Sequence, residues 1–225
     1  MQDRVDLRQR CGVNECPLEA EVAELRDRCR KLEELSYVDA LTGHYNFRYL
    51  QRALEMEMER TRRTKLPTSL IMLDLDHFKN INTVYGHECG NTALAWVARI
   101  LREGIRLIDI PCRYGGEEFA LILPGTSLIQ ATGIAERLRE AIASNPVRLQ
   151  DQEVSLSGSF GVVVFRFTDE LTISKFLSKA DELLYKAKNS GRNCVCTEEL
   201  PPVFQPDEVT AEEKAGLFAR FDEDE

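Results

Sequence analysis

The chain has 225 residues, 43% of them hydrophobic, and a formal net charge of −9 at pH 7. This length is enough for one sizeable core with a short extension at each end. The sequence has no apolar run of about 18 residues, no basic segment followed by an apolar one at its N-terminus, and no Lys/Arg cluster interleaved with aromatic residues. We therefore expect a cytoplasmic protein that does not insert into membranes and does not bind nucleic acid.

The 7 cysteines are scattered along the chain. Their odd number and the lack of a secretion signal indicate free thiols. Cys11 and Cys16 lie close together, but no second Cys or His pair lies nearby to complete a tetrahedral zinc site.

An N-terminal segment, residues 1–35, carries a heptad pattern over residues 18–35. Its apolar seam consists of Leu18, Val22, Leu25, Cys29 and Leu32. Steps of four and three residues predict a coiled-coil-like helix, which as a parallel dimer would hold two copies of the following domain side by side. The run is short, so an amphipathic helix packed on its own domain is an equal alternative.

After Ser36 the sequence alternates between helical and strand patterns. The expected helices cover residues 46–64, 90–107, 127–144 and 173–189, the last closed by Gly191. The expected strands cover residues 69–74, 111–114, 117–123 and 154–165. This order predicts an α+β fold, a ferredoxin-like or polymerase-palm antiparallel sheet with helices on one face.

Two groups of acidic residues follow strand patterns. The apolar run 71–76 carries acids at Asp74 and Asp76, so its buried length delivers a carboxylate to the end of the sheet. The neighbouring hairpin places Glu117 and Glu118 directly after two glycines, which permit positive φ and close approach of the backbone to a ligand. Carboxylates from two adjacent strands suit Mg²⁺, and two such ions would polarise an α-phosphate and stabilise a leaving pyrophosphate.

Over residues 36–197 the chain resembles the GGDEF family of diguanylate cyclases in its GGEEF form, which reads Gly115-Gly116-Glu117-Glu118-Phe119. The segments that match in order and spacing are 39–43, 73–82, 85–87, 113–119, 135–137, 159–161, 180–181, 185–188 and 191–193. The resemblance implies a nucleotidyltransferase that condenses two GTP into cyclic di-GMP and releases two pyrophosphates. Each half-site in this family holds one GTP, so the resemblance also implies a homodimer, whose proximity a coiled coil would supply.

The resemblance assigns a metal site to this sequence. It implies that Asp74, Glu117 and the Leu75 carbonyl hold two Mg²⁺ ions, with Mn²⁺ as an alternative, while Glu118 supports the metal site. Glu117 would also help deprotonate the attacking ribose 3′-hydroxyl, although a metal-bound mechanism needs no separate base.

The resemblance also assigns the phosphate contacts. It implies that the backbone at His77 and Phe78, with Lys188 and Arg192, holds the β- and γ-phosphates beside Gly115 and Gly116. The alternative for the two cations is that they only cap the C-terminus of the last helix.

A second motif, Arg106-Leu107-Ile108-Asp109, matches the RxxD product-inhibition motif of the family. With Arg137 it implies an inhibitory site in which arginines and an acid bind the phosphates and guanine edges of cyclic di-GMP. The alternative is an Arg–Asp pair in which the two residues contact each other at a helix end.

The sequence departs from the family at Asn91, where an aspartate is usual. A carboxylate accepts from both guanine N–H groups, whereas an amide offers one acceptor and one donor and suits adenine as well. Asn82, the other expected guanine contact, is intact. We therefore hypothesise relaxed base choice, with ATP as a second substrate and mixed cyclic GMP–AMP as a product. In the alternative, Asn91 accepts one guanine N–H and a water supplies the rest.

Milder departures are His44, Phe47 and Thr83, none at an assigned position. Residues 198–225 form an acidic tail with ten acidic side chains against Lys214 and Arg220, in which residues 211–221 have helical periodicity with Leu217, Phe218 and Phe221 on one face.

Two other classes of function compete with a cyclase. A non-catalytic module that only binds cyclic di-GMP would normally have lost its metal acids, yet Asp74, Glu117 and Glu118 are all present. A scaffold that dimerises through the N-terminal helix leaves the ordered acids and glycines unexplained.

Overall fold

The computed structural model describes residues 21, 22, 24–26, 28 and 37–199. The six upstream residues are helical, and Leu25 is 51% exposed in the single chain. The rest of the predicted heptad run, Cys11 and Cys16, and residues 200–225 of the acidic tail lie outside the described residues.

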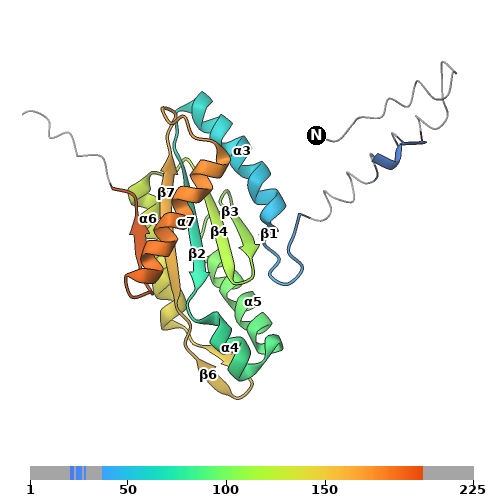
Figure 1. The fold of residues 1–225 in the computed structure, drawn as a ribbon, viewed down its shortest axis with the longest axis vertical. Helices are drawn as coiled ribbons and strands as arrows, with labels where there is room; N and C mark the ends of the chain where they lie inside the picture. The colour runs from blue at the N-terminus through green and yellow to red at the C-terminus, as the bar shows by residue number, and fades with distance from the viewer. Residues whose placement is uncertain (1–20, 23, 27, 29–36, 200–225) are drawn as a thin grey trace, which may run out of the picture.

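A six-stranded sheet forms the centre of the domain, in the order β1-β3-β4-β2-β7-β8 (Figure 1). The two outer pairs, β1 with β3 and β7 with β8, are parallel, and the three pairs between them are antiparallel. The strands are β1 (Tyr45–Asn46), β2 (Thr68–Leu75), β3 (Ile110–Gly115), β4 (Glu118–Pro124), β7 (Gly158–Phe165) and β8 (Val195–Thr197). A separate hairpin joins β5 (Val147–Leu149) to β6 (Gln152–Val154).

Five helices flank the sheet: α3 (Phe47–Thr64), α4 (Phe78–Tyr85), α5 (His87–Glu103), α6 (Leu128–Ser144) and α7 (Ile173–Asn189). Local chemistry fixes several of their ends. The side chain of Asn46 accepts the Tyr49 N–H at the start of α3, and Ser127 and Gln130 form a capping box at the start of α6. After α7, Gly191 has φ +106° and the Arg192 N–H donates to the Ala187 carbonyl, which confirms Gly191 as the end of that helix.

The helices cover both faces of the sheet, so the prediction of helices on one face is wrong (Figure 1). On one face α4, α5 and α6 pack with Ile71, Leu73 and Phe119 into one apolar cluster. On the other face α3 and α7 pack with Leu70 and Met72 into a second. The predicted α+β class and mostly antiparallel sheet are confirmed: β2, β3, β4 and β7 with α5 and α6 form a ferredoxin-like unit, and α3 and α7 close its open face.

The sequence also contains evidence for the second helical layer, formed by α3 and α7, which the prediction did not use. All eight residues of β2 and all eight of β7 are buried. A strand in a sheet with one solvated face alternates apolar and polar residues, whereas residues 70–73 of β2 and 162–165 of β7 are uninterrupted apolar runs. Their composition therefore already required helices on both sides.

Three predicted boundaries are also wrong. The helix expected over 90–107 runs instead from His87 to Glu103, and a separate helix, α4, precedes it, because Gly86 at φ +83° breaks the path between them. The strand expected over 154–165 begins only at Gly158, as β7, because Val154 ends β6 of the separate hairpin. Within the described part of the chain, no helix is both long and apolar enough to cross a membrane.

Candidate active site

Three elements bring charged side chains together at one end of the central strands. Asp74, near the end of β2, lies opposite Glu118 on β4 and Ser159 on β7. The Lys188 Nζ atom, near the end of α7, lies 2.8 Å from the Asp74 Oδ2 atom. Lys188 therefore does more than cap the C-terminus of α7, because its ammonium group pairs with a carboxylate of the sheet.

The turn between β3 and β4 presents the glycine pair and the two glutamates. Gly116 has φ +44°, a conformation that favours glycine. Arg113 donates to the Gly116 carbonyl through Nε at 3.0 Å and Nη2 at 2.8 Å. Its Nη1 atom lies 3.1 Å from Asp39 Oδ2. Arg113 therefore fastens this turn to the segment that precedes β1, a positioning role that the sequence prediction did not assign.

Three carboxyl groups at this end of the sheet, those of Asp74, Glu118 and Asp181, have raised pKa values. Burial raises the pKa of Asp74 most, and Glu117 and Asp76 raise it further, while the contact with Lys188 opposes them. The pKa of Glu118 is raised first by burial and then by Asp74. Burial also raises the pKa of Asp181 on α7, which the prediction left without a role, and Lys188 opposes that shift. The site thus holds more negative than positive charge.

This excess of negative charge, and the oxygen donors that produce it, fit a divalent cation. The donors assigned from the sequence are the carboxylates of Asp74 and Glu117 and the Leu75 carbonyl. Among the described residues, no three His, Cys, Asp or Glu side chains converge to enclose an ion. A magnesium ion is typically held by one or two carboxylates and completed by water and substrate phosphates, which is what this donor set allows.

Asp76, the second acid after the apolar strand, has a structural role instead. It is 8% exposed and accepts hydrogen bonds from the Ser159 hydroxyl at 2.7 Å, the Ser157 hydroxyl at 2.8 Å and the Asn193 N–H at 3.0 Å. These contacts join the end of β2 to β7 and to the turn after α7. The sequence alone did not separate the role of Asp76 from that of Asp74.

Backbone and cationic groups surround the acids. His77 adopts φ +56° and precedes α4, whose first residue, Phe78, is buried. The free N–H groups at the start of a helix attract anions. Arg192 is exposed on the turn after α7, next to Asn193, which binds Asp76. The assigned phosphate contacts therefore come from two segments that meet at the end of β2.

The two residues assigned to the base lie where α4 and α5 meet. A side-chain carbon at Gly90 would lie 2.0 Å from the Asn82 Oδ1 atom, so only glycine allows this close approach. Asn91 follows Gly90 directly and is exposed. Gly90 thus brings Asn82 and Asn91 into one neighbourhood, and this function of Gly90 was missed from the sequence.

The RxxD motif folds as a tight turn after α5. Asp109 is 5% exposed, and its Oδ2 atom accepts the Arg106 backbone N–H at 2.8 Å. Its Oδ1 atom is buried and has no hydrogen-bond partner among the described residues. Burial raises the pKa of Asp109, opposed by the contact with the Arg106 N–H. The carboxylate holds the turn, while the Arg106 side chain is exposed.

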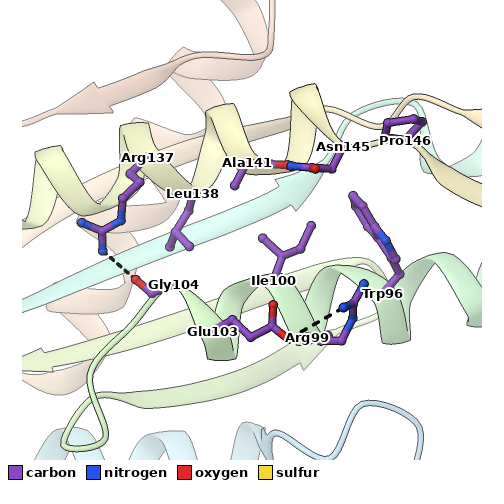
Figure 2. Close-up of a pocket in the computed structure, with 10 residues that line it drawn as sticks. All are labelled: Trp96, Arg99, Ile100, Glu103, Gly104, Arg137, Leu138, Ala141, Asn145 and Pro146. Carbon is purple, nitrogen blue, oxygen red and sulfur yellow. Dashed lines mark hydrogen bonds and ion pairs between the residues drawn. The ribbon is translucent and has the colours of Figure 1, made fainter.

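Arg137 approaches the same segment from α6 (Figure 2). Its Nη2 atom donates to the Gly104 carbonyl at 2.6 Å. It also lines a groove of about 600 Å³ between α5 and α6, with Trp96, Arg99 and Pro146 among the other lining residues. Arg137 therefore contacts Gly104, which lies two residues before Arg106 in the sequence.

The fold is that of a ferredoxin-like, palm-type domain with carboxylates gathered at one end of its central strands. The family model described as "Diguanylate cyclase, GGDEF domain" matches residues 36–194. The chain belongs to the GGDEF diguanylate cyclase family, as the motifs predicted.

Similar proteins agree with this membership. The response regulator PleD of Caulobacter vibrioides is 39% identical over 163 residues, which are 72% of this chain and 36% of PleD. The structure of diguanylate cyclase SiaD of Pseudomonas aeruginosa, solved with its activator SiaC, is 36% identical, with a TM-score of 0.69, and the match covers 80% of this chain and 68% of SiaD.

The coiled coil and GGDEF domain of DgcB from Caulobacter crescentus, solved with cyclic di-GMP, gives a TM-score of 0.69 at 25% identity, over 80% of this chain and 94% of that one. The chain spans only about a third of the length of PleD and 23% of diguanylate cyclase DgcP of Pseudomonas aeruginosa.

Proposed function

We propose that this chain condenses two GTP molecules into cyclic di-GMP and releases two pyrophosphates. The observation that carries the proposal is the convergence of Asp74, Glu118 and Lys188 below the Gly115-Gly116 turn in a domain of this family. We take residues 36–197 as the cyclase domain, residues 1–35 as a signalling or dimerisation segment, and residues 198–225 as an acidic tail.

The metal site of this proposal consists of Asp74, Glu117 and the Leu75 carbonyl. Two Mg²⁺ ions, or Mn²⁺ in their place, would supply charge neutralisation for the α-phosphate and the leaving pyrophosphate. Glu118, opposite Asp74, supports this arrangement by holding a second carboxylate beside it. Burial first, and then the neighbouring carboxylates, raise the pKa values of Asp74 and Glu118, and a bound cation would offset the cost of holding these charges together.

The protein's own groups would hold the nucleotide. The N–H groups at His77 and Phe78, with Lys188 and Arg192, bind the β- and γ-phosphates, while Gly115 and Gly116 let the backbone approach the α-phosphate. Lys188, which pairs with Asp74 in this structure, would become available to the phosphates if metal ions neutralised the acids. The attacking group is the 3′-hydroxyl of the GTP held by a second copy of the chain, so turnover requires a homodimer.

Product inhibition forms a separate part of the proposal. Arg106 and Arg137 supply the cations for the phosphates of cyclic di-GMP, and Asp109 keeps the turn that presents Arg106. Replacing Arg106 with Ala is expected to relieve inhibition by added cyclic di-GMP without lowering the initial rate. An unchanged inhibition constant in Arg106→Ala would remove this site from the account.

A second candidate product follows from Asn91, which is exposed beside Asn82 and offers one donor and one acceptor. It favours a cyclase that also accepts ATP and forms mixed cyclic GMP–AMP. A strict guanine enzyme would instead complete the contacts of Asn91 with water.

One experiment tests both products. Purified protein is incubated with GTP, with ATP and with both in the presence of Mg²⁺, and the products are resolved by mass spectrometry. Cyclic di-GMP from GTP supports the cyclase, and mixed product that disappears in Asn91→Asp supports relaxed base choice. Cyclic di-GMP alone, with the same base preference in Asn91→Asp, would exclude relaxed choice. Binding of cyclic di-GMP without any turnover would favour the non-catalytic module instead.

A further inference from the structure

An apolar groove opens at the end of the sheet opposite the candidate active site. Thr68, the first residue of β2, pairs with Phe165 at the end of β7, whereas Asp74 lies at the other end of β2. The C-terminal ends of α3 and β7 both lie at the upper end of the domain in Figure 1. The groove has a volume of about 350 Å³, and its apolar lining includes Pro67, Leu128, Ile129, Val164 and Phe167.

The apolar side chains of this groove are unusually open to solvent. Ile129 is 68% exposed and Phe167 is 49% exposed, and Leu66, between two lining residues, is 58% exposed. Single exposed apolar side chains are normal on soluble domains, but a contiguous group in a concave site indicates a surface that another segment covers.

The course of the chain after β8 brings a candidate segment to this groove. β8 is parallel to β7, with Phe160 beside Val195 and Val162 beside Thr197. The chain therefore leaves β8 in the direction of Phe165 and the groove. Immediately afterwards, Glu198 pairs with Arg166, a lining residue of the groove, at 3.0 Å. Residues 200–225 thus start beside the groove.

The charges around the groove complement that segment. Lys65 lines the groove and Arg63 lies in the last turn of the adjacent α3, while Arg62 and Arg166 beside them already pair with Glu59 and Glu198. The acids of the segment include Glu212 and Glu213 before its apolar residues and the run 222–225 after them. Opposite charges on two surfaces guide them together and disfavour other arrangements.

The apolar residues of the segment fall on one side of a predicted helix. The sequence pattern over residues 211–221 predicts a helix that would place Leu217, Phe218 and Phe221 on one face. The connecting residues 200–210 can span up to about 35 Å when extended, so the helix can reach a groove that begins near Glu198.

We infer that residues 211–221 of the same chain form a short amphipathic helix and dock on this groove, with Leu217, Phe218 and Phe221 covering Ile129, Phe167 and Val164. The docked helix buries the exposed apolar group and holds the three-residue edge strand β8 against β7.

Photocrosslinking from inside the groove tests this inference. Phe167 is replaced in the full-length chain by the photoreactive analogue p-benzoylphenylalanine, which retains an aromatic ring, and the irradiated protein is digested and analysed by mass spectrometry. We expect a cross-link in the band of monomer mass, to a peptide within residues 211–221. A matched control carries the analogue at Met56, which is 48% exposed on α3, and is expected to give no such cross-link.

Three outcomes would overturn the inference. These are a cross-link only in a band of dimer mass, a cross-link confined to residues 200–206, or the absence of any cross-link to the tail. The variant Leu217→Ser with Phe218→Ser and Phe221→Ser serves as a second test, since it is expected to abolish the cross-link and to increase hydrogen exchange in residues 127–130 and 164–168. Unchanged exchange in that variant would also contradict docking, whatever the protein's cyclase activity.

Discussion

Asp74 and Asp109 are both buried aspartates with raised pKa values, yet their surroundings differ. Asp74 lies near the end of the central strand β2, where it pairs with Glu118 of the neighbouring strand β4 and contacts Lys188. Asp109 accepts the backbone N–H of Arg106 in its own turn. Burial raises the pKa of Asp109, and no neighbouring carboxylate contributes to that change. Burial alone therefore does not identify a catalytic acid. A cluster of like charges with too few cations indicates a ligand site, whereas a carboxylate bonded to its own turn indicates a structural role.

Among the variants that separate these two aspartates, the largest change is expected in turnover when the cation beside Asp74 is removed. Lys188→Met keeps much of the side-chain volume but leaves the carboxylates without their ammonium partner and removes a phosphate contact. We expect turnover to fall by about 100-fold, as for other single groups that stabilise developing charge. Initial rates of cyclic di-GMP formation measure the loss.

Lys188→Arg is the matched control for charge and should recover part of the rate. A Lys188→Met enzyme with wild-type turnover would show that the contact with Asp74 has no catalytic importance.

Asp76 provides the structural counterpart at the same end of the sheet. Asp76→Ala removes three hydrogen bonds to a buried carboxylate, two of them from serine hydroxyls of the β7 region. The free energy of unfolding should decrease by about 3 kcal/mol, because hydrogen bonds to charged groups are stronger than average and the Ser159 hydroxyl would stay buried without its acceptor. Urea denaturation followed by circular dichroism measures this change, and a loss below about 1 kcal/mol would contradict it.

At the RxxD turn, the expected effect is smaller and concerns stability, not turnover. Asp109→Ala leaves the Arg106 N–H without its acceptor and should cost about 1 to 2 kcal/mol, as for the loss of a helix cap. Asp109→Asn keeps an acceptor oxygen and should cost less. In both variants the initial rate should stay at the wild-type value. A rate that falls as steeply as in Lys188→Met would erase the distinction between the two aspartates.

The smallest expected effect concerns a third buried group, His44. Both ring nitrogens are buried without hydrogen-bond partners in the described structure, and the ring packs edge-on against Phe119 at 5.9 Å between centroids. Burial, and then the charge of Arg102, lower its pKa to about 4. Replacing an unsatisfied buried polar group by an apolar one of similar size is neutral or stabilising, so His44→Leu should gain up to about 1 kcal/mol at pH 7.

The same substitution changes the pH dependence. The unfolded chain protonates His44 near pH 6.5, whereas the folded chain keeps it neutral until about pH 4, so wild-type stability decreases as the pH falls through this window. His44→Leu should show a shallower decrease over the same range in thermal unfolding. Identical slopes for the two proteins would show that His44 makes no contribution.

The sequence predicted the class of fold and the acids of the site because both depend on local patterns. Continuous apolar runs ending in Asp74, and glycines before Glu117, identify strand ends without any tertiary information. The same patterns could not separate Asp76 from Asp74, because the distinction depends on Ser157, Ser159 and Asn193, which are distant in sequence.

The errors in the prediction have similar causes. The helix expected over 90–107 started too late because the break at Gly86 is set by a positive φ that composition does not reveal. It ended too late because the Arg106 turn is stabilised by Asp109, whose role as an acceptor needs three-dimensional information. The role of Gly90 was missed because its close approach to Asn82 appears only when α4 and α5 are packed together.

The most direct test of the central claim is a turnover assay on the wild-type chain and on Asp74→Asn, with GTP and increasing Mg²⁺ and then Mn²⁺. The account predicts metal-dependent formation of cyclic di-GMP by the wild type and a decrease of at least about 1,000-fold in Asp74→Asn, which should unfold at or above the wild-type temperature because a buried charge is removed. Wild-type turnover in Asp74→Asn, or no product from the wild-type chain with either metal, would contradict it.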